Sequence, residues 1–179
     1  MRAQIRSEIA GVQTLDQAER IDVVRALAWV DSGATLCRIS KPATPPMHLV
    51  SYFVVVDGDQ VLLVDHKNAQ RWLPPGGHVE AGEHPRATVL RELQEELGFA
   101  APHAIAAPLL LTCSTTVGPS TPHVDVSLWY VVRCSRSQPL VFDAGEFNSV
   151  RWFPWGDVPP QRSEPHLPRF LAKLQSIGI

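Results

Sequence analysis

The segment from Gly77 to Phe99 constrains the fold of this chain more than any other part of its sequence. Pro85 suits the first turn of a helix, where its missing backbone N–H costs nothing, and Gly98 suits the position just after a helix ends. We therefore predict a helix over residues 84–97. At about 100° per residue, one arc of this helix is apolar and is expected to be buried; it holds Val89, Leu90, Leu93 and Leu97. The adjacent arc carries three carboxylates, those of Glu92, Glu95 and Glu96.

These carboxylates work against the stability of the helix. Like charges three and four residues apart repel each other, and negative charge near the C-terminus opposes the helix dipole. Converging carboxylates suit a hard divalent cation such as Mg²⁺ or Mn²⁺. Glu83 adds a fourth carboxylate just before the helix, and Arg91 is spaced to pair with Glu95. For any single glutamate a solvated acidic face is the simpler interpretation, but for the whole segment we favour a metal site.

The spacing of the segment resembles the signature of the Nudix hydrolase family, Gly-x5-Glu-x7-Arg-Glu-U-x-Glu-Glu-x-Gly-U, where U is a bulky apolar residue. All seven fixed positions are met, and Leu93 and Phe99 fill the two apolar ones. A chance match in one window has a probability below about one in 10⁸ at average residue usage. The resemblance covers 23 of 179 residues. The flanking strands also resemble the family's domain, whereas the first 45 residues lie outside the resemblance.

The resemblance implies an α+β fold, in which a mixed sheet lies between helices as an α/β/α sandwich. We expect the Nudix domain over residues 45–179 and an N-terminal helical extension with its linker over residues 1–44. The implied reaction is water attack on a diphosphate linkage, with Mg²⁺ or Mn²⁺ as the cofactor. The implied metal ligands are Glu83, Glu92, Glu95, Glu96 and the carbonyl of Gly77.

The roles of the other implied site residues are less uniform in the family. Arg91 would orient the glutamates, and the identity of the general base stays open. Glu146 stands on a turn-rich loop before the last predicted strand, where many relatives carry an acidic residue that binds a metal or acts as the base. The alternative is a solvated loop glutamate.

The predicted substrate is a small diphosphate compound, a nucleoside diphosphate derivative such as a nucleotide, a nucleotide sugar or a dinucleotide. One alternative is an isomerase of an isoprenoid diphosphate. Such enzymes need additional acid–base residues, typically including a cysteine, and Cys37 and Cys113 stand in no pattern that suits this role. Another alternative is a non-catalytic nucleotide-binding regulatory module. Degenerate modules usually lose signature glutamates, and here all are present.

Four residues outside the signature are candidates for substrate binding. His123 and Asp125 alternate with valines as a predicted strand begins, and they share a face with Trp129. An ordinary edge strand with one polar face is the alternative. Arg71 precedes a Gly-Gly turn and could meet a phosphate.

Zinc ligands and disulfides are not predicted. The three cysteines, Cys37, Cys113 and Cys134, form no CxxC pair, and reduced thiols are the simpler interpretation. The spacing of three histidines matches no zinc pattern; these are His78, His84 and His123.

Hydrophobic periodicity and turn residues predict the remaining elements. A helix over residues 15–31 should begin with a capping box of Thr14 and Gln17. Its buried face would hold Leu15, Ala18, Val24, Leu27 and Ala28. A proline-rich linker over 41–46 follows, then a hairpin of strands 49–56 and 60–65. The last predictions are strands over 104–116, 124–134 and 150–153 and a helix over 165–176.

The overall charge and hydropathy exclude some classes of function. A net charge of -2 and a pI near 6.4 give no electrostatic reason to expect non-specific nucleic-acid binding. The N-terminus has no apolar signal region, and no apolar run reaches the roughly 18 residues of a membrane span. We therefore expect a cytoplasmic protein without membrane contact. The apolar face of the N-terminal helix should cover the domain or join a homodimer interface.

Overall fold

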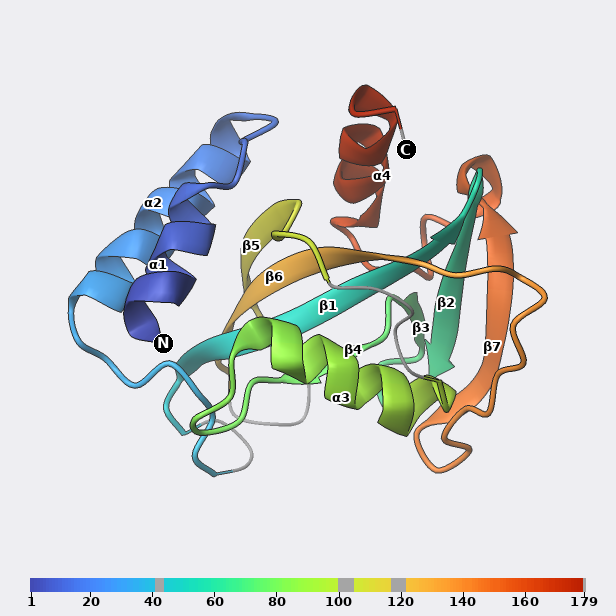
Figure 1. Ribbon diagram of the computed structural model, residues 1–179, viewed down its shortest axis with the longest axis horizontal. Helices are drawn as coiled ribbons and strands as arrows, with labels where there is room; N and C mark the ends of the chain where they lie inside the picture. Colours follow the sequence, from blue (N-terminus) through green and yellow to red (C-terminus); the bar gives the residue numbers. More distant parts are fainter. Residues whose placement is uncertain (41–43, 100–104, 117–121, 179) are drawn as a thin grey trace.

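A seven-stranded mixed sheet forms the centre of the computed structural model (Figure 1). The structure describes residues 1–40, 44–99, 105–116 and 122–178. The sheet has the order β3-β2-β1-β6-β5, with β4 paired to β1 and β7 paired to β2. The β1–β6 pair is parallel and the others are antiparallel. The strands are β1 (Met47–Asp57), β2 (Gln60–His66), β3 (Arg71–Leu73), β4 (Gly76–His78), β5 (Leu110–Thr115), β6 (Val124–Arg133) and β7 (Phe147–Pro154).

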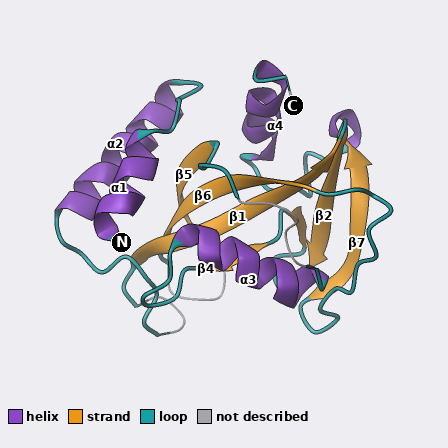
Figure 2. Ribbon diagram, viewed as in Figure 1, coloured by secondary structure: helices purple, strands orange, loops and turns teal. Residues whose placement is uncertain are grey.

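Helices cover both faces of this sheet (Figure 2). They are α1 (Arg2–Ala10), α2 (Gln17–Asp31), α3 (Pro85–Leu97) and α4 (Leu167–Ser176), with a short 3-10 turn, η1 (Trp155–Asp157). One apolar cluster joins the sheet to α1, α2 and α3, and a second joins its other face to α4. This arrangement confirms the predicted α/β/α sandwich.

The signature helix α3 begins and ends where its sequence predicts. Pro85 lies in the first turn, and Gly98 ends the helix with a left-handed φ of 70°. Three of the four predicted apolar residues are fully buried, namely Val89, Leu93 and Leu97. Leu90 is 47% exposed, so its assignment to the buried face was wrong.

The first helix pair differs from the prediction in its cap and its buried face. Asp16, not Thr14, caps α2, and its side chain accepts a hydrogen bond from the N–H of Glu19. The predicted face was also wrong, because Leu15 and Val24 are 45% and 62% exposed. The buried residues of α2 are Glu19, Val23, Ala26 and Val30, spaced four, three and four apart. Because the charged Glu19 is part of this buried stripe, apolar periodicity alone does not identify the stripe.

Several shorter elements were not separately predicted. β3 and β4 form between residues 71 and 78, where no strand was predicted. The last strand starts at Phe147, three residues earlier than expected. Parts of the predicted linker and of the strand over 104–116 fall on residues 41–43 and 104, outside the described residues. No helix in the described ranges is long and apolar enough to cross a membrane.

Candidate active site

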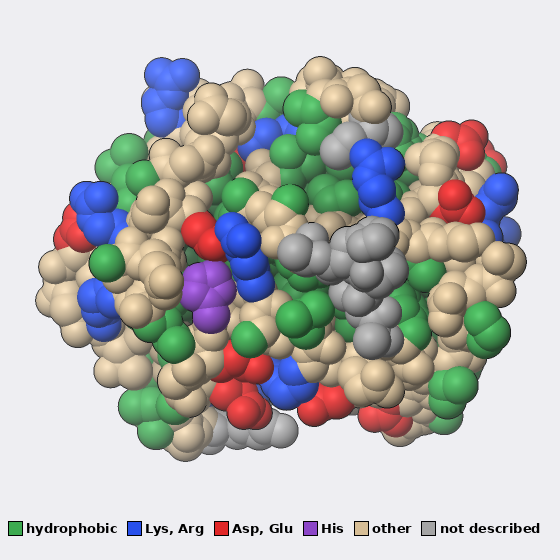
Figure 3. All heavy atoms as spheres, in the orientation of Figure 1, with side chains coloured by type: hydrophobic (Ala, Val, Ile, Leu, Met, Phe, Trp, Pro, Cys, Tyr) green, Lys and Arg blue, Asp and Glu red, His purple; other side chains and the backbone are tan. Residues whose placement is uncertain are grey.

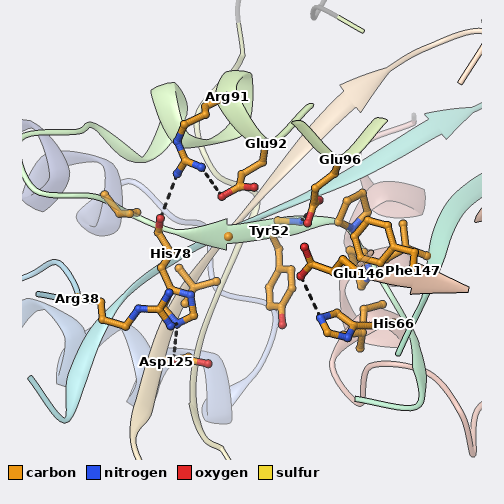
Figure 4. A pocket seen from close by; sticks show the side chains of 18 of the residues that line it. Arg38, Tyr52, His66, His78, Arg91, Glu92, Glu96, Asp125, Glu146 and Phe147 are labelled. Carbon is orange, nitrogen blue, oxygen red and sulfur yellow. Dashed lines mark hydrogen bonds and ion pairs between the residues drawn. The ribbon is translucent and has the colours of Figure 1, made fainter. Parts of the chain in front are cut away.

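A cavity of about 470 Å³ lies between α3, β4 and the start of β7. The signature contributes Arg91, Glu92 and Glu96 to its wall, and the loop before β7 contributes Glu146. Figure 4 shows Glu96 and Glu146 pointing toward each other, with Glu92 beside them. The structure therefore brings two of the predicted helix carboxylates to the predicted loop carboxylate.

Arg91 holds three of the signature glutamates. Its Nε donates to Glu83 Oε1 (3.1 Å), and its Nη1 donates to Glu92 Oε1 (2.7 Å) and Glu95 Oε2 (3.0 Å). Its Nη2 donates to the carbonyl oxygen of His78 (3.2 Å). The hydrogen bond to Glu83 is the main cause that raises the pKa of Arg91. These contacts suit an orienting residue better than one that touches substrate.

Glu83 stands behind Arg91 rather than in the cavity wall. Burial acts to raise the pKa of Glu83, but hydrogen bonds from Arg91 and Thr88 outweigh it and lower the pKa. The Thr88 hydroxyl donates to Glu83 Oε2 at 2.7 Å. Glu83 is therefore an ionised carboxylate that already has its counterion.

Glu92 and Glu96 are the buried carboxyl groups of the site. Burial is the main cause that raises the pKa of Glu96 to about 9, and the charges of Glu92 and Glu146 add to it. Burial also raises the pKa of Glu92, against the influence of Arg91. The two side chains belong to residues only 9% and 5% exposed. Buried carboxylates with raised pKa values beside a cavity fit a hard divalent cation, which would remove the repulsion.

Two glycines let the backbone of β4 come close to its neighbours. A Cβ at Gly77 would lie 1.8 Å from Glu92 Oε1. A Cβ at Gly76 would lie 2.2 Å from the Ser51 carbonyl oxygen, and the φ of Gly76 is 153°. The Gly76 N–H donates to Glu96 Oε2 at 2.9 Å. The glycines therefore bring the β4 backbone against both carboxylates.

Glu146 is held on the β2 side of the cavity. Its Oε1 lies 3.3 Å from His66 Nε2, and its carbonyl oxygen accepts the N–H of Lys67. Its side chain is 43% exposed, so water can reach it. His66, which lines the cavity at the end of β2, was missed because a single histidine at a strand end gives no sequence signal.

Glu95, Arg71 and Trp129 were also predicted as site residues, but none of them is among the described residues that line the cavity. The side chain of Glu95 is 58% exposed and pairs with Arg91. Arg71 donates to a backbone carbonyl on the loop before α4. Trp129 is fully buried behind Tyr52, with ring centroids 4.9 Å apart. Tyr52 itself lines the cavity, whereas Trp129 belongs to the core.

Asp125 lines the far end of the same cavity, together with His78 and Arg38. His123 lies against Asp125, with Nε2 3.4 Å from Oδ1, but is itself only 9% exposed. Burial is the main cause that lowers the pKa of His78 to about 4, and Arg38 adds to it. Arg38 was missed by sequence reasoning because it comes from the segment before β1, outside the family resemblance.

The comparisons with known proteins agree with this geometry. Residues 47–174 match the family model described as the NUDIX domain. The putative ADP-ribose pyrophosphatase YjhB of Bacillus subtilis is 28% identical over 117 residues, 65% of this chain and 54% of that protein. The chain therefore spans about half the length of this relative. The MutT-like protein of Streptomyces ambofaciens is 29% identical over 148 residues, 80% of this chain and 90% of that protein.

A solved structure shares the fold. The NUDIX domain of Shewanella oneidensis NrtR, complexed with ADP ribose, matches with a TM-score of 0.57 at 23% identity. The match covers 72% of this chain and 86% of that chain. Because the family model spans well over half of the residues, this chain belongs to the Nudix family.

Proposed function

We propose that the chain is a hydrolase that uses Mg²⁺ or Mn²⁺ to cleave a diphosphate linkage in a nucleoside diphosphate derivative. The observation that carries the proposal is the pair of buried carboxylates, Glu92 and Glu96, in the wall of a cavity that Glu146 also lines. These three side chains offer carboxylate oxygens, which suit a hard cation such as Mg²⁺ or Mn²⁺ better than a soft metal ion.

The ion would be held by Glu92 and Glu96, with Glu95 and the Gly77 carbonyl completing the set and Glu83 assisting. A bound divalent cation neutralises phosphate oxygens and lowers the pKa of water. Arg91 keeps the glutamates in position by bonding three of them.

Glu146 is the proposed proton acceptor for the attacking water. It faces Glu96 across the cavity, is reachable by solvent and is oriented by His66. A general base must lie within direct or one-water reach of the proton that it takes. The exposed Glu95 and the Arg91-bound Glu83 are less suited, because Glu95 lies outside the cavity wall and Glu83 is already paired.

ADP-ribose is the first substrate to test. The name of YjhB is that of a putative ADP-ribose pyrophosphatase, and the NrtR domain was solved with ADP ribose. Asp125, with His123 behind it, is proposed to bind the part of the substrate beyond the diphosphate. Arg71 and Trp129 stay as weaker candidates, because neither lines the cavity among the described residues.

The two alternative functions have less support. An isomerase would need an acid–base cysteine, and no described cysteine lines this cavity. Cys113 instead donates to the Asp22 carbonyl oxygen, and burial raises its pKa to about 12. A regulatory module would tolerate lost carboxylates, yet the signature is complete.

A substrate panel separates the three functions. The full chain is incubated with ADP-ribose, nucleoside triphosphates, nucleotide sugars, dinucleotides and an isoprenoid diphosphate, with Mg²⁺ or Mn²⁺, and products are resolved by chromatography. We expect metal-dependent cleavage at a diphosphate. Isomerised product, or tight binding without turnover, would contradict the proposal.

The Glu146→Gln variant tests the base. Turnover should fall at least about 100-fold with a smaller change in KM, since the residue acts on the water rather than on substrate affinity. Asp157→Asn, an exposed acidic residue on η1, is the control and should be unchanged. If Glu146→Gln kept full activity, Glu146 would not be the general base, and it would be an ordinary solvated loop residue.

Two further properties remain proposals. Free Cys37, Cys113 and Cys134 suit a reducing compartment, so we propose the cytoplasm. A homodimer is also proposed, because Leu15, just before α2, and Ile21 and Val24 on α2 are exposed apolar side chains. Charged side chains of both signs are mixed over the face shown in Figure 3, without the single-sign field typical of nucleic-acid binding.

A further inference from the structure

Three histidines and an aspartate gather at the end of the cavity away from Glu96 and Glu146 (Figure 4). They are His48, His78, His123 and Asp125, here called the histidine cluster. One ligand atom from each lies within 4.8 Å of the others. We propose that the histidine cluster binds one Zn²⁺ ion, separate from the cation of the signature glutamates.

The sheet brings the four residues together, although they are far apart in sequence. His48 on β1 and Asp125 on β6 are direct partners in the parallel register. His78 is on β4, which pairs with β1 two residues further along, at Val50. His123 comes just before β6 and stacks on His48, with ring centroids 4.9 Å apart. The ligands therefore stand on paired strands, which favours a preformed site.

Three imidazole nitrogens surround one carboxylate oxygen. The Nε2 atoms of His48, His123 and His78 lie 3.2, 3.4 and 3.9 Å from Asp125 Oδ1. Tetrahedral Zn²⁺, with bonds of about 2.0–2.1 Å, holds its ligand atoms about 3.3 Å apart. Small side-chain rotations would bring the cluster to that spacing.

The position of the proton on the His48 ring favours a cation between His48 and Asp125. Its Nδ1 lies 2.9 Å from the Pro45 carbonyl oxygen, which can only accept, so Nδ1 carries the proton. In a neutral ring, Nε2 then presents a lone pair to Asp125 Oδ1. Both atoms are buried and have no hydrogen-bond partner among the described residues. Two buried acceptors 3.2 Å apart are unfavourable, and either a second proton on His48 or a metal cation between the two atoms would remove the conflict.

Outer contacts orient the rings for this role. His123 Nδ1 lies 3.0 Å from Thr116 Oγ1, as His48 Nδ1 lies near Pro45. Metal-bound histidines usually place one ring nitrogen on the metal and the other on such a partner. The Nε2 atoms of both rings therefore point into the cluster.

The guanidinium group of Arg38 contacts the histidine cluster in the structure, at His78. Its Nη1 lies 3.2 Å from His78 Nε2, which must accept because a guanidinium only donates. Zn²⁺ would displace Arg38 from this position. Arg38 is only partly buried, so it can turn toward solvent.

The donor set selects the metal and its role. Three imidazoles and one carboxylate suit Zn²⁺ and disfavour Mg²⁺, which prefers oxygen. Four protein ligands leave no open position for water, which is typical of a structural site. The ion would thus stabilise this end of the cavity rather than activate water. His84, one of the three histidines whose spacing matches no zinc pattern, caps α3 instead, and the fold puts His48 in its place.

Zinc binding is measured directly, without turnover, and so does not depend on the proposed function. The metal-free full chain is dialysed against Zn²⁺ in excess Mg²⁺, and bound zinc is counted by mass spectrometry. We expect one Zn²⁺ per chain, at least tenfold weaker binding in His48→Gln and His78→Gln, and unchanged binding in the control His84→Asn. Arg38→Ala should bind zinc more tightly, because it removes a competing charge.

Three results would overturn the proposal. One is zinc retained in both His48→Gln and His78→Gln but lost in the double variant Glu92→Gln, Glu96→Gln. Another is the absence of Mg²⁺-resistant zinc. The third is an Arg38→Ala variant with weaker ADP-ribose binding and unchanged zinc binding, which would make the cluster an anion-binding part of the pocket. Circular dichroism checks that each variant folds. His78 is less buried than His48, so His78→Gln still tests the site if His48→Gln does not fold.

Discussion

At the scale of single residues, Glu96 lowers the stability of the metal-free chain at a position that the proposed metal site needs. It is 5% exposed, lies beside Glu92 and has a pKa raised to about 9, mainly by burial. The Gly76 N–H donates to Glu96 and compensates for this burial only in part. A residue in this position destabilises the metal-free chain, which explains why its charge conflicts with the helix pattern.

The Glu96→Gln variant should lose turnover by at least about 100-fold, because a cation ligand is removed. In chelator at neutral pH, its Tm should exceed that of the wild type, because folding of the wild type must either protonate Glu96 or bury its charge. Mg²⁺ should raise the Tm of the wild type more than that of the variant. Glu95→Gln is the matched control for stability, since the Glu95 side chain is 58% exposed. A lower Tm for Glu96→Gln in chelator would contradict this account.

At the scale of elements, α2 begins with a different cap from the one that its sequence suggested. Asp16 accepts from the N–H of Glu19, and Glu19 Oε2 accepts from the N–H of Leu15 in return. The arrangement differs from a capping box only in that the returning hydrogen bond comes from Leu15, one residue before the cap, and it starts two residues later than the Thr14 box. Asp16 also receives two hydrogen bonds from Arg169 on α4, so the cap connects two helices.

The cap assignment can be tested by paired substitutions. Asp16→Ala should cost about 1 kcal/mol or more in the free energy of unfolding, because a helix cap and its contact with Arg169 are lost. Thr14→Ala should cost almost nothing. Urea denaturation of both variants measures the difference, and equal effects would restore Thr14 as the cap.

The start of α4 should make stability depend on pH. Burial is the main cause that raises the pKa of Glu164 to about 7, and backbone N–H groups oppose it. A folded-state pKa above the unfolded value of 4.5 favours the folded state fully below that value, and this contribution is lost as pH rises through 7. Between pH 5 and 8 the wild type should therefore lose up to about 3 kcal/mol relative to Glu164→Gln. Urea curves at both pH values measure this, and a constant difference would refute it.

At the scale of the whole molecule, one buried ion pair joins the N-terminal extension to the last helix. Lys173 on α4 contacts Glu19 on α2, and both are almost fully buried. Lys173 also donates to the Leu109 carbonyl oxygen. Together with Ile5, Ile9 and Val30 in the core, this pair makes the extension part of the packing around the sheet.

Lys173→Met should cost about 3–5 kcal/mol, because it leaves the Glu19 charge buried without a partner. The double variant Lys173→Met, Glu19→Leu should recover most of that loss. Thermal denaturation of the wild type, both single variants and the double variant measures the coupling. Additive effects would show that the pair does not connect the two ends of the chain.

Local residue patterns accounted for much of the fold and for the centre of the site. Pro85, Gly98 and the apolar positions between them defined α3, because helix ends and period depend on neighbours in sequence. The same spacing placed the signature glutamates on one side of that helix. The hairpin of β1 and β2 followed from Gly58 and its flanking apolar strands in the same way.

Tertiary structure decided what depends on contacts between distant segments. Glu19 is buried only because Lys173 reaches it from 154 residues away, so no local period could reveal the buried face of α2. His48 and Asp125 meet only through the parallel register of β1 and β6, and His78 joins them through β4. Spacing along the chain identifies ligands that share one helix, whereas ligands from three strands become neighbours only when the sheet forms.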